Sequence, residues 1–421
     1  METSYDYALS LDAADPLREF RDQFVIPLRE GREQIYFLGN SLGLQPRKTH
    51  GKIKEVLQQW SDWGVEAFFM GEHPWLDFHE KLADPMSMVV GALPHEVVVM
   101  NQLTVNLHLM LASFYRPTGK RFRIICEAKA FPSDQYMLET HLKFLGFDPD
   151  ETIIEVSPRR GEHTIRTEDI LQAIKTHESS LALILWGGVQ YYTGQVFDME
   201  TITKAGHAAG AVVGFDLAHA AGNVPLRLHD WQVDFAAWCN YKYMNGGPGA
   251  IGGAFIHERY HGDPSLPRLA GWWGYDASRR FKMEKGFVPD RGAAGWQLST
   301  PSPLQYACLQ ASLEIFTAAG MPALHEKGRA LNDYLIRLLE SIVREAGERA
   351  IEIITPIKNP EKGCQVSLLM HRKGKETFSA LQQAGIFADW REPNVIRVAP
   401  VPLYNRFTEV WQFADCLRRM L

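Results

Sequence analysis

Cysteine is scarce in this chain of 421 residues, which has five, at positions 126, 239, 308, 364 and 416. The count is odd and no two of them lie close together, which argues against a disulfide framework and against a cysteine-based zinc site. We expect no metal site, and we expect a reducing compartment, the cytoplasm.

Long hydrophobic runs are also missing. No apolar stretch approaches the ~18 residues that span a bilayer. Residues 1–15 are polar and acidic, without the charged and then apolar order of a signal peptide. The sequence indicates neither a membrane-spanning protein nor a processed precursor.

A basic excess is absent too, because 50 acidic residues outnumber 44 basic ones and give a net charge of -6. The chain therefore lacks the basic stripe of a protein that binds nucleic acid or membrane surfaces. It contains neither the Gly-x-x-x-x-Gly-Lys-[Ser/Thr] loop of nucleotide phosphate sites nor the His-Glu-x-x-His pair of zinc proteases. The expected partners are a small molecule and a second copy of the chain.

Short apolar or β-branched runs recur through the middle of the chain. They cover residues 96–100, 122–126, 152–156, 181–186, 211–216, 234–238 and 251–256. Several are apolar throughout, as in strands buried on both faces of a mostly parallel sheet. The sequence therefore predicts an α/β fold with a mostly parallel sheet flanked by helices.

Apolar residues at helical spacing predict further helices at 48–63 and 321–348. We predict that the chain divides into three parts. They are an N-terminal segment that packs with the small domain (1–60), a large α/β domain (61–305) and a small C-terminal α+β domain (306–421).

Asp216 and Lys242 are the most informative pair of residues. Asp216 ends an apolar strand, and Lys242 lies 26 positions later, just before the glycine-rich turn 246–249. A lysine that forms a Schiff base with pyridoxal 5'-phosphate needs an acid that keeps the pyridine nitrogen protonated, so that the ring acts as an electron sink. Alone, such a lysine is usually a solvated charge, and such an aspartate a helix cap or an ion-pair partner. Together they favour a pyridoxal-phosphate site.

The same glycines allow another interpretation, since Gly247, Gly249 and Gly252 match the Gly-x-Gly-x-x-Gly fingerprint of dinucleotide-binding folds. That fingerprint follows a strand and opens a helix. Here a strand-like run, residues 254–256, comes next. We therefore favour the lysine site.

Further segments suit such a cofactor. Leu103 and Thr104 open an apolar helix whose free N–H groups could hold a phosphate, the alternative being an ordinary helix start capped by Asn101 or Thr104. Residues 131–134 form a turn after a strand, whose phenylalanine could stack on a flat cofactor or simply belong to the core. His219 could bond the cofactor's phenolic oxygen, or be an ordinary satisfied histidine.

Seven stretches along most of the chain resemble the kynureninases, which belong to the fold type I, aspartate-aminotransferase-like enzymes. They are YFLGNSLGLQP (36–46), FPSD (131–134), GVQYYTGQVFDM (188–199), FDLAHAAG (215–222), NYKYMNGGPG (240–249), LAGWWG (269–274) and IRVAPVPLYN (396–405). The lysine and aspartate stretches alone indicate only the wider fold type, which cysteine desulfurases share. The first and the last two stretches are far more specific.

The resemblance implies a hydrolase that uses pyridoxal 5'-phosphate and acts on carbon–carbon bonds in ketonic substances. Its substrate would be L-kynurenine, or the 3-hydroxy relative, cleaved between Cβ and Cγ. The products would be L-alanine and anthranilate or 3-hydroxyanthranilate, in tryptophan catabolism and NAD biosynthesis. A homodimer is implied as well.

The same resemblance assigns roles to individual residues. Lys242 matches the Schiff-base lysine, Asp216 the partner of the pyridinium nitrogen and Tyr241 a residue of proton transfer. The other expected cofactor-binding residues are Leu103, Thr104, Phe131, Pro132, Ser133, Asp134 and His219, with Trp272 and Thr300 reaching the phosphate from the neighbouring subunit. Arg397, whose planar fork suits a carboxylate, and Ser41 are expected to bind the substrate.

Several positions depart from the family pattern. Phe215 and Ala220 stand where relatives often carry Trp and Ser, and we expect a modest effect. In some animal members a histidine and an asparagine read the aryl ring, but residues 63–66 contain no histidine and Thr300 stands in the asparagine place. We therefore favour unhydroxylated kynurenine as the substrate.

Two other functions stay open. A lyase or desulfurase of the same fold type usually needs a mobile catalytic cysteine, and Cys239 alone among the five lies near a motif. A non-catalytic scaffold would bind the cofactor without turnover. The presence of Lys242, Asp216, Tyr241 and Arg397 argues against such decay.

Overall fold

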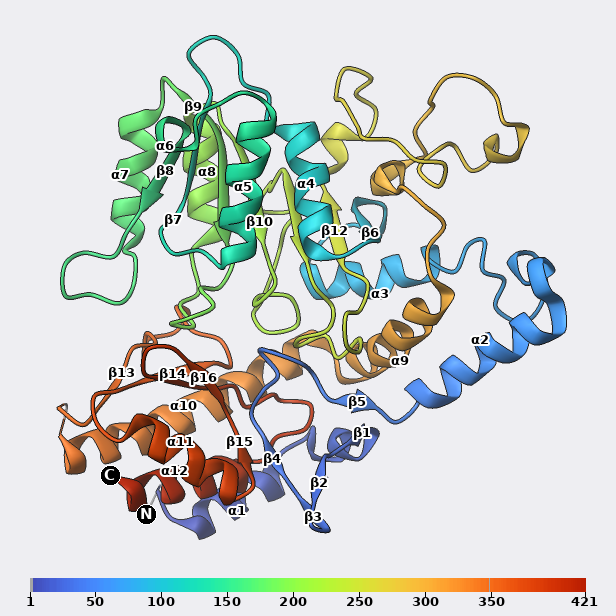
Figure 1. Ribbon diagram of the computed structural model, residues 1–421. Helices are drawn as coiled ribbons and strands as arrows, with labels where there is room; N and C mark the ends of the chain where they lie inside the picture. Colours follow the sequence, from blue (N-terminus) through green and yellow to red (C-terminus); the bar gives the residue numbers. More distant parts are fainter. Residues whose placement is uncertain (1–2, 348) are drawn as a thin grey trace.

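The computed structural model describes residues 3–347 and 349–421 and has a central sheet of seven strands (Figure 1). The strands are β6 (Val97–Val99), β7 (Arg123–Glu127), β8 (Ile153–Val156), β9 (Leu181–Gly187), β10 (Val212–Asp216), β11 (Phe235–Trp238) and β12 (Gly253–Ile256). Each falls on one of the seven apolar runs of the sequence, and no end differs by more than two residues. These predicted strands are confirmed.

The sheet is mostly parallel, as predicted. Its order is β6-β12-β11-β10-β9-β7-β8, and only β12 runs antiparallel to its neighbours. The carboxyl ends of β7, β9, β10 and β11 therefore meet at one edge, where open α/β sheets bind their ligands.

Helices bury both faces of this sheet. In β6, Val98 belongs to one hydrophobic core, which includes residues of α4 (Leu103–Phe114) and α5 (Pro132–Phe144). Val97 and Val99 belong to the other core. That second core includes residues of α3 (Glu80–Val90), α7 (Thr167–His177), α8 (Met199–Ala208) and α9 (Pro303–Ala319). Burial on both faces explains why several of the runs have no polar side chain in alternate positions.

A smaller antiparallel sheet of four strands lies nearer the C-terminus (Figure 1). Its order is β13 (Ile351–Ile353), β14 (Val366–Met370), β17 (Val395–Val398) and β16 (Asp389–Arg391). Its core includes residues of α10 (Met321–Ala346), α11 (Gly374–Gln383) and α12 (Phe407–Met420). The helix predicted at 321–348 is confirmed as α10, although position 348 lies outside the described residues.

The N-terminal part contacts both halves of the molecule. Helix α1 (Tyr5–Ala14) packs on α12, where the Asp12 carboxylate accepts hydrogen bonds from the backbone N–H groups of Phe407 (2.6 Å) and Thr408 (3.2 Å). Helix α2 (Thr49–Trp63), predicted at 48–63, packs on α9 instead. The predicted division at residues 60 and 305 stays a prediction.

The remaining elements are short. They are β1 (Phe24–Val25), β2 (Leu28–Arg29), β3 (Arg32–Glu33), β4 (Ile35–Tyr36), β5 (Gln45–Pro46), β15 (Ile386–Phe387), α6 (Pro149–Thr152), η1 (Arg18–Gln23), η2 (Gly64–Phe68), η3 (Pro94–Glu96), η4 (Glu258–Tyr260), η5 (Arg280–Lys282) and η6 (Gly292–Trp296). Strand β4 pairs with β15, which connects the N-terminal segment to the C-terminal part of the chain.

None of the described helices is by itself long and apolar enough to cross a membrane. Helices α9 and α10 meet the length and composition requirements only as a pair, and that pair is bent by 84°. Both helices bury side chains inside the protein.

Candidate active site

A cavity of about 240 Å³ opens at the carboxyl edge of the large sheet. Nine of the residues expected to bind cofactor line it, namely Leu103, Thr104, Phe131, Ser133, Asp134, Asp216, His219, Tyr241 and Lys242. Segments that lie far apart in the sequence meet here because the parallel strands end at the same edge.

Lys242 lies in this cavity on the loop between β11 and β12. Its side chain is largely buried, and Nζ lies 5.8 Å from the Phe131 ring centroid and 5.7 Å from that of Tyr241. The loop turns through Gly247 (φ +96°) and Gly249 (φ +64°), a backbone conformation that residues with a Cβ rarely adopt. Strand β12 follows this loop, so the helix that a dinucleotide fingerprint requires is not formed there.

The Gly-Asn-Ser-Leu-Gly segment packs directly against the lysine loop. The Gly43 backbone N–H donates to the Tyr241 carbonyl oxygen at 2.8 Å. A Cβ at Gly43 would lie 2.3 Å from the Lys242 carbonyl oxygen, so only glycine fits without displacing the loop. This contact links the N-terminal part of the chain to the position of Lys242.

Three carboxyl groups line the same cavity. The Asp216 Oδ1 accepts a hydrogen bond from the Ala218 backbone N–H at 2.7 Å. Burial, together with the negative charge of Asp216, raises the pKa of Asp134 well above its usual range and raises the pKa of Glu127 to about 8. Lys242 is the only lysine or arginine among the described residues that line the cavity. A ring with a protonated nitrogen would add positive charge beside the acids.

Another part of the cavity wall is suited to an anion. Gln102, Leu103 and Thr104 line it at the start of α4, and no side chain caps that helix. Free N–H groups and the positive end of the dipole at a helix start bind phosphate. The helix start predicted at Leu103 is confirmed, whereas neither Asn101 nor Thr104 caps it.

His219 contributes a buried and unpaired nitrogen. Its Nδ1 has no hydrogen-bond partner among the described residues. Burial, with the nearby charge of Lys242, lowers the pKa of His219 well below its usual value. The ring is therefore neutral at pH 7 and available to a ligand oxygen. The acids, the helix start and this histidine together fit pyridoxal 5'-phosphate.

Tyr241 lies beside Lys242, and burial raises the pKa of its hydroxyl. The nearest cysteine in sequence, Cys239, is 3% exposed, and burial raises the pKa of its thiol. No cysteine of the described chain lines the cavity. The mobile catalytic thiol that a desulfurase needs is therefore not found there.

Five predicted site residues do not line the cavity. Pro132 is the first residue of α5, a position where a backbone N–H would have no partner within the helix, so a proline is tolerated there. Residues 131–134 therefore begin a helix, and the turn predicted for them is wrong. Ser41 is half-buried and its backbone N–H donates to Leu38. Trp272 is 43% exposed and Thr300 is exposed.

Arg397 is the fifth of these residues and is fully buried. It lies just behind the cavity, because its Nη1 donates to the carbonyl oxygen of Tyr191, which lines the cavity.

Sequence reasoning missed Glu127, Tyr191 and Gln102 as lining residues. Glu127 is the last residue of β7 and occupies the same kind of position as Asp216 at the end of β10. An acid at the end of a buried parallel strand was the signal that could have found it. Tyr191 lies in the stretch 188–199 that carries the family resemblance, which was a signal for it. Gln102 carries no comparable signal, because its place depends on how a loop folds over the sheet edge.

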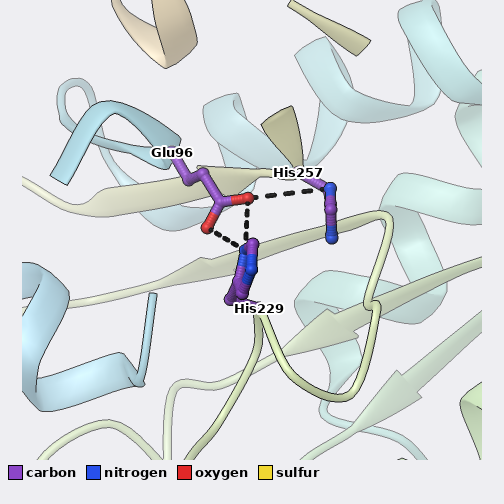
Figure 2. Close-up of side chains that lie close together, drawn as sticks. All are labelled: Glu96, His229 and His257. Carbon is purple, nitrogen blue, oxygen red and sulfur yellow. Dashed lines mark hydrogen bonds and ion pairs between the residues drawn. The ribbon is translucent and has the colours of Figure 1, made fainter. Parts of the chain in front are cut away.

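A separate cluster of Glu96, His229 and His257 lies away from this cavity (Figure 2). His229 Nδ1 lies 3.0 Å from Glu96 Oε1, and His257 Nδ1 lies 3.6 Å from the same oxygen. The carboxylate already accepts backbone N–H groups of Leu93 and Glu258. The two imidazole rings are stacked at 18°, so their in-plane lone pairs do not converge on one point. We interpret the cluster as a structural network.

Comparison with known proteins agrees with the geometry. The aminotransferase class-V family model matches residues 90–352, and the kynureninase C-terminal domain model matches residues 324–417. The kynureninase of Flavobacterium psychrophilum is 51% identical over 99% of this chain and 98% of its own. That of Stenotrophomonas maltophilia is 51% identical over 98% and 97%.

Solved structures share the fold. A cystine C-S lyase, solved in complex with its product cysteine persulfide, superposes with a TM-score of 0.75 at 17% identity, covering 91% of this chain and 97% of its own. The cysteine desulfurase CsdA of Escherichia coli gives a TM-score of 0.75 at 16% identity, covering 96% and 98%. The specific relationship comes from the full-length matches at about half identity, and by these the chain belongs to the kynureninase family.

Proposed function

We propose that the cavity around Lys242 hydrolyses L-kynurenine between Cβ and Cγ to give anthranilate and L-alanine. The observation that carries the proposal is the placement of Lys242, Asp216 and Tyr241 around one cavity, with the uncapped start of α4 on its wall. Membership of the kynureninase family supplies the substrate class.

When bound, pyridoxal 5'-phosphate supplies the electron sink that makes the substrate's Cα proton acidic and the Cβ–Cγ bond breakable. Asp216 would hold a proton on the ring nitrogen. Lys242 would hold the cofactor before substrate binds, and its free Nζ would then take the substrate's Cα proton. The Tyr241 hydroxyl, whose raised pKa keeps it protonated, delivers a proton to Cβ after the bond breaks. Water adds to the carbon of the side-chain carbonyl, and its oxygen remains in the carboxylate of anthranilate.

The substrate's own carboxylate is assigned to Arg397. A buried guanidinium is a strong and directional partner for a carboxylate. Its contact with the carbonyl oxygen of Tyr191 places it against the cavity wall. Ser41 is proposed to act nearby, on the segment that packs against the lysine loop.

A homodimer is the proposed assembly. Trp272 contacts Phe281 (ring centroids 5.6 Å apart), and Phe281 contacts Phe69 (5.9 Å), although all three rings are at least 43% exposed. An apolar patch of this kind on the outside of a chain favours association. A second copy that covers it would bring Trp272 and Thr300 to the phosphate end of the partner's cavity.

The substrate preference, the compartment and the division of the chain are further proposals. We favour L-kynurenine over its 3-hydroxy relative, because Thr300 and residues 63–66 lack the amide and imidazole groups that would read a ring hydroxyl. We place the enzyme in the cytoplasm, and we keep the division into parts 1–60, 61–305 and 306–421.

The deciding experiment is turnover of L-kynurenine by the purified protein, with both products identified and the visible spectrum of the same sample recorded. Stoichiometric anthranilate and alanine, with cofactor absorbance, are expected. Cofactor absorbance without either product would overturn the hydrolase and leave a lyase or a silent scaffold. Turnover of 3-hydroxykynurenine with a higher kcat/KM would overturn only the substrate preference.

A further inference from the structure

Arg397 is held by a neighbour on the adjacent strand. Asp389 and Arg397 face each other across the antiparallel pair β16 and β17. The Arg397 Nε donates to Asp389 Oδ2 at 2.6 Å, and Nη2 forms an ion pair with the same oxygen. Arg397 is 0% exposed, so water does not reach its guanidinium, and Asp389 supplies negative charge beside it.

The contacts occupy only part of the guanidinium. An arginine has five N–H donors, and Nε shares one edge of the planar group with Nη2. Asp389 lies on that edge, while Nη1 donates to the carbonyl oxygen of Tyr191 on the cavity wall. Nη2 makes no hydrogen bond with the part of the chain that the structure describes. The outer edge, between Nη1 and Nη2, therefore keeps donors for a ligand.

Asp389 also holds a second arginine. The Arg391 Nε donates to the same Oδ2 at 2.9 Å. The positive charges of Arg397 and Arg391 both act on His219, which lines the cavity. The two guanidinium groups would repel each other without the carboxylate between them. Asp389 thus fixes the direction of one arginine and offsets the charge of both.

We propose that Asp389 is the positioning residue for the substrate carboxylate. It binds the Nε edge of Arg397 and so leaves the Nη1–Nη2 edge to bind an α-carboxylate. This proposal rests on the proposed function in one respect, because it takes Arg397 as the residue that binds the substrate carboxylate. The same role of Asp389 applies to any α-amino acid that enters the cavity, since every α-amino acid carries that carboxylate.

The test compares Asp389→Asn and Asp389→Glu with Asp415→Asn. Asp415 pairs with Arg419 on the surface of α12, so its change to Asn alters the same chemistry far from the cavity. For Asp389→Asn we expect KM for L-kynurenine to rise roughly 10- to 100-fold with a much smaller change in kcat, since a misdirected anchor weakens binding. Asp389→Glu should recover part of the affinity, and Asp415→Asn should match the wild type.

A binding measurement separates this inference from the hydrolase. L-Alanine and ethylamine both carry an amine, but only L-alanine carries a carboxylate. Binding of each to the cofactor-loaded protein is followed by the change in visible absorbance. Asp389→Asn should weaken L-alanine and leave ethylamine unchanged, and this holds even if the wild type fails to cleave kynurenine.

Three results would overturn the proposal. Unchanged or tighter L-alanine binding in Asp389→Asn would mean that Asp389 competes with the ligand for Arg397. Equal weakening of L-alanine and ethylamine would show a general structural role. Loss of cofactor absorbance or of the thermal transition in both Asp389 variants would also assign Asp389 to the fold alone.

Discussion

Gly43 offers the sharpest test of how the N-terminal segment positions Lys242. In Gly43→Ala the new Cβ would lie 2.3 Å from the Lys242 carbonyl oxygen and 2.9 Å from Asn245 Cα. These are backbone atoms, which cannot rotate away as a flexible side chain would. The loop that carries Lys242 must move instead.

The size of the effect follows from that distance. An ordinary contact needs a separation of about 3.5 Å, so the loop shifts by about 1 Å. Overpacking of this kind costs about 1–3 kcal/mol of folding free energy. A displacement of about 1 Å at a catalytic group lowers the rate by roughly 10²-fold. We therefore expect Gly43→Ala to fold, with a lower thermal midpoint and a kcat reduced by roughly 10- to 100-fold.

Gly51→Ala is the matched control. Gly51 lies within α2 and a Cβ there would meet nothing within 4 Å. Alanine is favoured over glycine inside a helix by roughly 0.5–1 kcal/mol, so the thermal midpoint should rise while kcat stays the same.

The assays are steady-state turnover of L-kynurenine, thermal unfolding and the visible spectrum, on both variants and the wild type. Wild-type kcat and thermal midpoint in Gly43→Ala would refute the reasoning, because the loop would then have absorbed the clash elsewhere. A fall in the midpoint without a fall in kcat would show that the segment supports the fold and does not position Lys242.

Three further predictions concern the site and the core. Lys242→Ala should lose the visible absorbance of the lysine-bound cofactor and lower kcat by roughly 10³-fold, with circular dichroism unchanged; unchanged absorbance would contradict the assignment. Arg397→Ala should raise KM for kynurenine far more than it lowers kcat, and unaltered kinetics would place the substrate carboxylate elsewhere. His79 is buried, and burial lowers its pKa from 6.5 to about 4. The unfolded chain then binds the extra proton as pH falls below 6.5, so stability is lost from there down to about pH 4. The loss attributable to His79 should reach roughly 1–2 kcal/mol by pH 5. Denaturant titrations of the wild type and His79→Gln at pH 7 and pH 5 measure this loss of folding stability. Equal losses in the two proteins would contradict the prediction.

The strands of the large sheet could be predicted because burial on both faces leaves a direct mark on the sequence. The run 181–186 is apolar throughout, as is 235–238 within the predicted run 234–238, and both proved to be strands. The turn predicted at residues 131–134 was wrong for a local reason, because Pro132 is as suitable for the first position of a helix as for a turn. Only the packing of α5 on the sheet decides between these two outcomes.

The residues of the site divide in the same way. Lys242 and Asp216 could be identified from the sequence, because a glycine-rich turn and a strand end are local features that place chemical groups. Gln102 could not, because its place in the cavity depends on how a loop folds over the sheet edge, and neither could Asp389, because its role follows from the pairing of β16 with β17. The hydrogen bond from Arg397 to Tyr191 joins residues 206 positions apart.

The sequence by itself determined the α/β class, the positions of the strands along the chain and the choice of Lys242 and Asp216 as candidate site residues, because periodicity, composition and short motifs are local properties. Only the tertiary structure decided which carboxyl groups share the cavity, that position 43 has room only for glycine, and how Asp389 binds Arg397. The first two depend on close approach between segments far apart in the chain, and the third depends on the pairing of β16 with β17. Burial in a space with little water strengthens each of these contacts.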